Sequence, residues 1–274
     1  MGKLSILRAS ILILPALVLG GGSGHADTRA AAAPATAAEA PVDPQAKDAL
    51  TRMSDFFKSL SSFSIREDIT REQVINSDLK VEKLSTADVV VRRPTGLKVE
   101  VVGDDGKAHS LFYDGKTLSV FMPDHNYYAQ AAAPPTLGPA MDMAESQYGI
   151  EFPTSDVLRM AAGDDFTKEL TAAGFVGKSR VGDTDCDHYA YRSKEVDYQL
   201  WIQSGDKPLL RKMVITSKKQ PSQPEFTSVL AWDLSPKIDD STFAFTPPQG
   251  ATRIAFGTTP KPGVTQPQKV QQGK

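Results

Sequence analysis

Short β-rich runs separated by turn residues are the feature that most constrains the fold of this chain. From Phe63 to Gln130, and again from Phe175 to Ser235, such runs are broken by segments like Pro94-Thr95-Gly96 and Asp114-Gly115. Breaks this short favour antiparallel neighbours, because a parallel pair needs a long crossover connection. We therefore predict an α+β fold whose core is one antiparallel sheet of about ten strands.

One hairpin shows the pattern most clearly. Tyr198, Leu200 and Ile202 alternate with polar residues, Ser204 to Pro208 supplies turn chemistry, and a second extended run begins at Leu209. Alternation with a period of two places one apolar face against the core and the other toward water. A hairpin of this kind is not stable by itself, so we expect Leu200 and Ile202 to face a covered interior.

Two other runs repeat this alternation and extend the predicted apolar face. Its expected inward positions are Leu97, Val99, Val101, Leu118, Val120 and Met122. A sheet of about ten strands must curl or split. Two outcomes stay open: the helices and a tighter barrel fill the interior completely, or a curled sheet leaves an apolar hollow.

Three or four helices are expected beside the strands. Asp43 and Pro44 form a good helix start, and an apolar stripe then continues to about Ser61. Within a helical insert between residues 138 and 174, one helix is expected from Thr154 or Ser155 to Gly163 and a second from Asp164 to Gly174. The glycines are the predicted stop signals.

The two ends of the chain carry different signals. Residues 1–26 have two early basic residues, an apolar run from Ile11 to Leu19 and small residues before a cleavage site after Ala26, which predicts a secretory signal peptide. We expect an Ala/Pro-rich tether at 27–43, one domain at 44–256 and a disordered tail at 257–274. The expected location is periplasmic, with the protein exported and soluble. Cys186 lies far from the cleavage region, so no lipid anchor is predicted.

Composition restricts the classes of partner and chemistry. A net charge of −2 gives no concentrated basic face, so no nucleic-acid partner is predicted. With one cysteine, no internal disulfide can form; burial of an inert Cys186 thiol is favoured over pairing between chains.

Motifs for catalysis or cofactor binding are weak. The stretch "AAGFVGKS" lacks the first glycine and the strand-to-helix context of a phosphate-binding loop. In "DTDCDH", the strand period places Asp183, Asp185 and Asp187 on one side and His188 on the other, so a solvated strand edge is favoured over a metal site. We predict no catalytic residue, no metal ligand and no cofactor, and hence no enzyme.

Several stretches together resemble the LolA-type periplasmic lipoprotein carriers. They are "FFKSLSSFS", "VVVRRPTGLKVEV", "SLFYDGKTLSVFMP" and the closing "FAFTPPQGA", in the family's order and across most of the domain. The stretches from Cys186 to Lys218 look closer to a branch of bacterial proteins described as predicted periplasmic, which departs from LolA itself in its C-terminal half.

The resemblance implies an open, strongly curved half-barrel closed by helices over a hydrophobic cavity. The arginine of the family's Arg-Pro strand, tied to lid closure and cargo release, falls on Arg93. Leu97 stands where the family has Phe, which keeps an apolar group and loses the ring. The alternative for Arg93 is a surface strand cation, because its neighbour Arg92 points oppositely and either one could be the outward residue.

We therefore predict a carrier for a lipid, the acyl chains of a lipoprotein or another hydrophobic ligand. The partner is a hydrophobic ligand or a lipidated protein, and transient membrane contact is compatible with this. The predicted ligand-binding residues are Arg93, Leu97, Val99, Val101, Leu118, Val120, Met122, Leu200 and Ile202. The alternative is a non-enzymatic envelope sensor or interaction module that uses the same cleft for an envelope protein.

Overall fold

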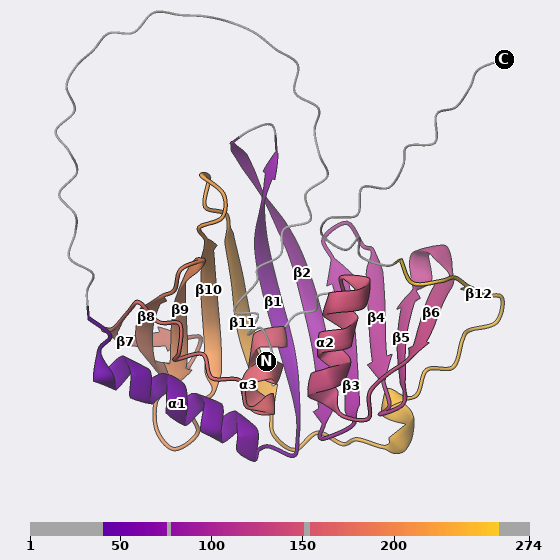
Figure 1. Cartoon of the computed structure of the whole chain (residues 1–274), viewed down its shortest axis with the longest axis horizontal. Coiled ribbons are helices and arrows are strands. Elements are labelled where there is room, and N and C mark those ends of the chain that lie inside the picture. Colours follow the sequence, from indigo (N-terminus) through magenta and orange to yellow (C-terminus); the bar gives the residue numbers. More distant parts are fainter. Residues whose placement is uncertain (1–40, 76–77, 151–153, 258–274) are drawn as a thin grey trace, which may run out of the picture. The chain divides into compact units, whose positions relative to one another are not determined.

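The computed structural model describes residues 41–75, 78–150 and 154–257 (Figure 1). The predicted signal peptide, most of the tether and nearly all of the predicted tail lie outside the described residues. The described chain divides into two compact units. The first unit comprises residues 41–53, 70–75, 78–83 and 165–228, and the second comprises 54–69, 84–150, 154–164 and 229–257.

Within the described ranges, twelve strands form one sheet in the order β12-β6-β5-β4-β3-β2-β1-β11-β10-β9-β8-β7. The terminal strands β12 and β7 are not neighbours, so the sheet is open. The helices are α1 (Pro44–Ser59), α2 (Leu137–Tyr148) and α3 (Ser155–Ala162). The strands are β1 (Ser62–Ile75), β2 (Leu79–Arg92), β3 (Gly96–Gly103), β4 (Ala108–Tyr113), β5 (Thr117–Met122), β6 (Tyr127–Ala132), β7 (Ala172–Val181), β8 (Thr184–Arg192), β9 (Val196–Gln203), β10 (Leu210–Ser217), β11 (Glu225–Asp233) and β12 (Thr252–Arg253).

These elements confirm the predicted α+β class and the open antiparallel sheet. The neighbouring pairs from β2 to β6 and from β7 to β10 are all antiparallel, as the short connections predicted. The added strand β12 is two residues long and pairs in parallel with β6. With two residues, β12 is too short to show an alternation of apolar and polar side chains, so the sequence pattern does not predict it.

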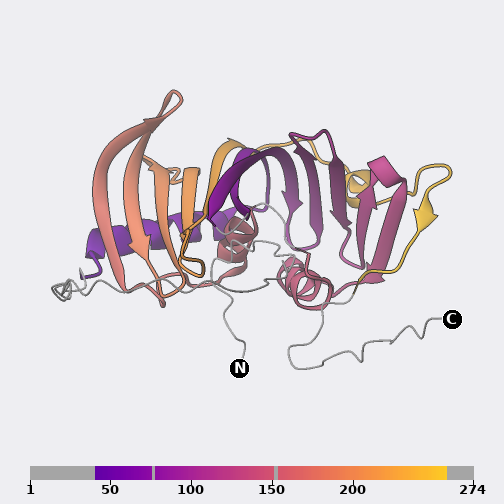
Figure 2. The same cartoon turned by 90° about the horizontal axis from the view of Figure 1, so that it is seen from above.

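In the first unit, the N-terminal part of α1 covers one face of the strands. Tyr198, Leu200 and Ile202 are 1–4% exposed on β9, and Leu50 and Met53 of α1 are 0% exposed. The Tyr191 hydroxyl donates a 2.9 Å hydrogen bond to the Ala46 carbonyl in α1. Strands β8 to β10 are bent along their length (Figure 2). The hairpin from β9 to β10 is therefore covered by another part of the chain.

The helix start at Asp43 is confirmed. The Asp43 carboxylate accepts a 2.9 Å hydrogen bond from the Gln45 backbone amide, which satisfies an amide at the start of α1. The predicted helix from Thr154 to Gly163 is also confirmed as α3, which ends at Gly163 with φ of 110°.

The prediction of a second helix in the insert, from Asp164 to Gly174, is wrong. Residues 166–169 form turns, and Ala172 already belongs to β7. The Asp165 carboxylate accepts hydrogen bonds from the Thr167 amide at 3.0 Å and the Thr167 hydroxyl at 2.7 Å. Such local side-chain bonds compete with helical bonds, and Gly174 lies within a strand.

In the second unit, the segment after β11 packs on the outer face of β3 to β6. Phe243 is 2% exposed and lies against Gly96; a Cβ atom there would lie 2.6 Å from the Phe243 ring. The Phe245 ring has its centroid 5.3 Å from that of Phe112 and 5.7 Å from that of Phe121. The stretch "FAFTPPQGA" is thus explained by packing: its two phenylalanines attach this segment to the sheet.

Candidate functional site

The inner face of the second unit is the strongest candidate for a binding surface. Cross-strand pairing arranges its side chains in three rows that run across β2 to β6. The first row is Val91, Leu97, Tyr113, Leu118 and Ala131; the second is Val89, Val99, Leu111, Val120 and Ala129; the third is Ala87, Val101, His109, Met122 and Tyr127. In the third row, Met122 lies beside His109 by continuation of the pairing between Phe121 and Ser110.

Exposure increases from the first row to the third. Val91, Leu97, Tyr113 and Leu118 are 0–2% exposed. In the second row Val120 is half-buried, and in the third Met122 is half-buried while Tyr127 is 42% exposed. The apolar face is therefore closed along its first row and becomes accessible along its third, on the side of β4 to β6.

Helices α2 and α3 supply the buried cover of this unit (Figure 2). α2 buries Leu137, Ala140, Met141 and Ala144, which follow one another at spacings of three, one and three and so form one stripe. The Leu137 amide donates a 2.9 Å hydrogen bond to the Pro94 carbonyl, and the Tyr113 hydroxyl donates a 2.6 Å bond to the Pro134 carbonyl. The beginning of α2 is therefore attached to the end of the sheet where the first row lies.

One cation joins the two helices. The Arg159 side chain of α3 is 15% exposed and forms ion pairs with Glu145 and Asp142 of α2, at 2.5 and 3.3 Å, and with Asp164 at 3.5 Å. Asp156, half-buried one turn before Arg159, lies in the same cluster. Burial raises the pKa of Asp156 to about 6, with Arg159 opposing and Glu145 adding to the shift. The contact between α2 and α3 therefore depends on charge.

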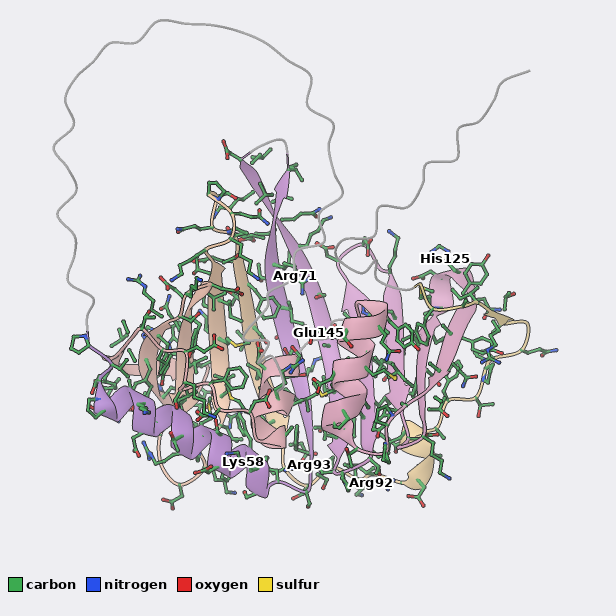
Figure 3. The ribbon with its side chains drawn as sticks, in the orientation of Figure 1. Lys58, Arg71, Arg92, Arg93, His125 and Glu145 are labelled. Carbon is green, nitrogen blue, oxygen red and sulfur yellow. The ribbon has the colours of Figure 1, made fainter. Side chains whose placement is uncertain are left out.

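Arg93 lies at the end of α1 rather than among the three rows. Its Nη1 donates a 2.7 Å hydrogen bond to the Lys58 carbonyl, and its amide donates a 2.8 Å bond to the Ser61 carbonyl (Figure 3). A basic side chain on the last helical carbonyls is favourable there. The structure thus gives Arg93 the contact of a helix C-cap.

Arg92 points to the other face, as the alternation predicted. Its Nη1 pairs with Asp240 at 2.7 Å, and its guanidinium lies 4.9 Å from the centroid of the Phe243 ring. The two adjacent arginines therefore hold two different segments, the end of α1 and the segment after β11.

The structure brings six of the predicted binding residues together. Leu97, Val99, Val101, Leu118, Val120 and Met122 all belong to the three rows of the second unit. Leu200 and Ile202 lie in the first unit, on the face of β9 that α1 covers. Those two residues have the burial of core positions.

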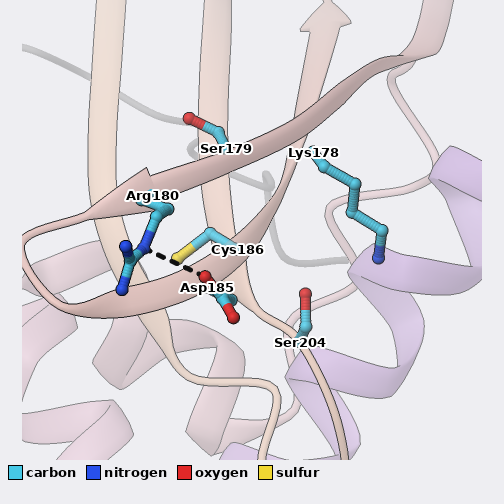
Figure 4. Close-up of a pocket in the computed structure, with 6 residues that line it drawn as sticks. All are labelled: Lys178, Ser179, Arg180, Asp185, Cys186 and Ser204. Atoms are coloured by element: carbon cyan, nitrogen blue, oxygen red, sulfur yellow. Dashed lines mark ion pairs between the residues drawn. The ribbon is translucent and has the colours of Figure 1, made fainter.

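A separate pocket of about 440 Å³ lies in the first unit, at the ends of β7 and β8 (Figure 4). It is lined by Lys178, Ser179, Arg180, Asp185, Cys186 and Ser204, and contains none of the predicted binding residues. Arg180 pairs with Asp185 at 3.1 Å, and Lys178 pairs with Asp187. The Cys186 thiol is buried, and burial raises its pKa. Both cations of the lining are thus already paired with aspartates, and the pocket is separate from the inner face of the second unit.

The buried carboxyl of Glu67 is a candidate that sequence reasoning missed. Glu67 is 1% exposed and lies on the face of β1 that also buries Phe63, Ile65 and Ile69. The signal was present, because Glu67 interrupts an otherwise apolar alternation at positions 63, 65 and 69. Among the residues that the structure describes, no group of three or more His, Cys, Asp or Glu side chains could hold a metal ion.

Comparison with known protein families identifies the family to which this chain belongs. The sequence profile of a family described as "Predicted periplasmic protein (DUF2092)" matches residues 46–257. The chain belongs to the DUF2092 family. This confirms the predicted relationship to a branch of bacterial proteins described as predicted periplasmic. The match begins two residues into α1 and ends just beyond β12, so the DUF2092 region includes both units.

Solved structures similar to this DUF2092 protein include three bacterial proteins. The lipoprotein LppX of Mycobacterium tuberculosis is 15% identical, with a TM-score of 0.46 over 72% of this chain and 100% of that one. LprF of Mycobacterium bovis is 14% identical, with a TM-score of 0.41 over 77% and 100%. A LolA superfamily protein of Nitrosomonas europaea is 13% identical, with a TM-score of 0.34 over 73% and 97%.

No curated protein sequence matches the DUF2092 chain. Within residues 41–75, 78–150 and 154–257, none of the helices has the length and apolar character needed to cross a membrane.

Proposed function

We propose that this protein is a non-enzymatic periplasmic carrier that binds the hydrocarbon part of a lipid or lipidated protein. The binding surface is the inner face of the second unit, with Leu97, Val99, Val101, Leu118, Val120 and Met122 as contact residues. The periplasmic location rests on the family description and on the predicted export signal.

One observation carries the proposal: the three apolar rows are covered by helices and not by a second sheet. The cover is attached at the first row through Pro94 and Pro134, whereas Val120, Met122 and Tyr127 lie half-buried or exposed on the other side. A face that is closed along one edge and accessible along the other can admit an acyl chain if the helices move apart from the sheet.

The energetics of this binding are favourable. Each methylene taken from water into an apolar site contributes about 0.8 kcal/mol. A chain of about sixteen carbons therefore contributes roughly 10 kcal/mol before the costs of association. Binding needs no covalent chemistry, which agrees with the weak catalytic motifs in the sequence.

Arg93 has a different part in this proposal. Through its bond to the Lys58 carbonyl it holds the end of α1, while its neighbour Pro94 holds the beginning of α2. The Arg93-Pro94 pair is therefore the fixed attachment from which the α2 cover moves, and Arg93 acts by positioning helices and not by touching the ligand.

The first test is extraction of bound lipid. We expect the full chain, isolated from bacterial envelope extracts, to release lipid into organic solvent, as detected by mass spectrometry, and to take up a fluorescent fatty acid. If neither lipid nor uptake is found and an envelope protein co-elutes on size exclusion, the interaction-module alternative replaces the carrier.

A matched pair of variants tests whether the inner face of the second unit is the surface that binds the ligand. Val120→Glu places a charge on the half-buried second row and is expected to lower fluorescent fatty-acid uptake at least tenfold, because a buried unpaired charge is strongly unfavourable. Val102→Glu makes the same change at a 46% exposed position on the opposite face of β3 and is expected to leave uptake unchanged. Equal uptake by both variants would remove the inner face from the proposal.

A further inference from the structure

Glu67 is a carboxyl group placed where the sheet otherwise buries only apolar or small side chains. It is 1% exposed, and its neighbours on the same face of β1, Ile65 and Ile69, are 2% and 5% exposed. On the opposite face of the same strand, Arg66 and Asp68 are exposed. Strand β1 thus has charged residues on its solvent-facing side, where they stay hydrated, and one carboxyl group on its buried side.

Strand pairing places Glu67 at the end of the third row. The Arg93 amide bonds to the Ser61 carbonyl, and Arg66 pairs with Asp88 at 2.9 Å, so β1 and β2 run antiparallel with these residues opposite each other. The same pairing sets Glu67 opposite Ala87. Ala87 pairs in turn with Val101, and Val101 pairs with His109.

The third row is therefore the polar row of an otherwise apolar face. Glu67 lies at its buried end and His109 lies further along the row, with Ala87 and Val101 between them. The strands around His109 desolvate the imidazolium and lower its pKa, although the residue itself is exposed. The first and second rows contain no charged side chain.

Burial of a carboxyl group is costly unless its contacts compensate for the lost water. An apolar residue at position 67 would satisfy the packing without that cost, as Ile65 and Ile69 do at the adjacent positions. A carboxylate has about four lone-pair sites, so a contact within the protein still leaves it able to accept a hydrogen bond. Buried ionisable groups of this kind concentrate at functional sites.

We propose that Glu67 recognises the head group of the bound amphiphile and selects ligands that donate a hydrogen bond there. In this arrangement, which rests on the carrier function proposed above, the hydrocarbon lies along the first and second rows and the head lies along the third. The ligand class is an amphiphile with a hydroxyl or ammonium head, which donates to a carboxyl oxygen of Glu67, whereas a carboxylate head has no donor to offer. Because Glu67 is nearly inaccessible, the ligand reaches it only when the cover has moved.

The test compares three probes with the same hydrocarbon chain: dodecylamine, dodecanol and dodecanoate. Each is titrated against the full-length protein loaded with a fluorescent apolar dye, and displacement of the dye reports the affinity. We expect the amine and the alcohol to bind about tenfold more tightly than dodecanoate, because the hydrogen bond that dodecanoate cannot donate has that magnitude.

Two variants and a control test the role of Glu67 in head-group recognition. Glu67→Gln keeps the shape and introduces an amide donor to a carboxylate head, so the preference for the amine over dodecanoate is expected to collapse while dye binding persists. Glu67→Leu is expected to abolish the preference for the alcohol as well. Asp68→Asn, on the exposed face of the same strand, is expected to bind all three probes as the unmodified protein does.

The two proposals fail in different ways. If the dye binds and all three probes displace it with ratios that Glu67→Gln and Glu67→Leu leave unchanged, the head-group assignment is overturned and the carrier function stands. If neither the dye nor any probe binds the unmodified protein, both the carrier function and the head-group assignment are overturned. Should Glu67→Leu not fold, the isosteric Glu67→Gln variant alone decides the assignment.

Discussion

Arg93 makes its observed hydrogen bonds within the protein, at the end of α1. Its family resemblance suggested a polar group at the mouth of a cavity, whereas its hydrogen bonds go to Lys58 and Ser61 at the end of α1. The neighbouring Arg92 pairs with Asp240. At the residue scale, the observed contacts of Arg93 are thus those of a residue that holds a helix end.

Replacement of Arg93 tests this placement. Arg93→Met removes the donor to the Lys58 carbonyl and is expected to lower the free energy of unfolding by about 1–3 kcal/mol, the range for a hydrogen bond from a charged group. Thermal denaturation followed by circular dichroism measures the change. Arg92→Met, which loses an exposed ion pair and a ring contact, serves as the comparison; a smaller loss for Arg93→Met than for Arg92→Met would contradict the C-cap role.

At the scale of elements, helices α2 and α3 form a cover that is held by charge as well as by packing. Arg159 pairs with Glu145, Asp142 and Asp164, while Asp156 beside it has its pKa raised to about 6. One arginine therefore faces four carboxyl groups, and protonation of Asp156 relieves part of the negative charge. The strength of the cover should consequently depend on pH.

The sign of this dependence follows from the raised pKa of Asp156. The folded state holds the Asp156 proton up to about pH 6, whereas the unfolded chain releases it near its ordinary value of 3.8. Between these values the folded state binds more protons, so the contribution of Asp156 to stability falls as pH rises and is constant above about pH 6.

Asp156→Asn is expected to remove this slope. The difference in melting temperature between Asp156→Asn and the unmodified protein should grow in favour of the variant from pH 4 to pH 6.5 and then level off. Melting curves at half-unit pH steps measure it. Other carboxylates, such as Asp197 beside Arg192 and Lys218, have lowered pKa values and the opposite slope, so only the difference between the two proteins reports on Asp156. A difference that is constant with pH would contradict the raised pKa.

At the scale of the whole molecule, the described chain consists of two compact units, and the carrier proposal concerns the second. That unit is assembled from residues 54–69, 84–150, 154–164 and 229–257, so it joins stretches that lie far apart in the sequence. The last stretch contributes Phe243 and Phe245 to the outer face and β12 to the edge of β6, and its Phe256 stacks on Tyr148 of α2 at 4.5 Å. The final residues of the family match are therefore part of the fold.

Shortening the chain tests this contribution. Removal of all residues after Asp239 exposes Phe112, Phe121 and Tyr128 on the outer face and is expected to lower the melting temperature and increase the binding of a hydrophobic dye such as ANS. Differential scanning fluorimetry measures both effects. Phe245→Ala should reproduce part of the loss, and less than the about 3–5 kcal/mol of a fully buried ring, because Phe245 is half-buried. An unchanged melting temperature in the shortened protein would show that the segment does not stabilise the unit.

The sequence by itself determined the antiparallel sheet, the start of α1 and the orientation of residues such as Leu97, Val120 and Leu200, because strand alternation and helix capping depend on neighbours within a few positions. The tertiary structure alone decided the rest. It separated Leu200 from the rows that contain Leu97, and it paired the residues from Ala172 to Gly174 with β8 where a helix was predicted. Each of these depends on contacts between distant segments, whose partners no local period contains.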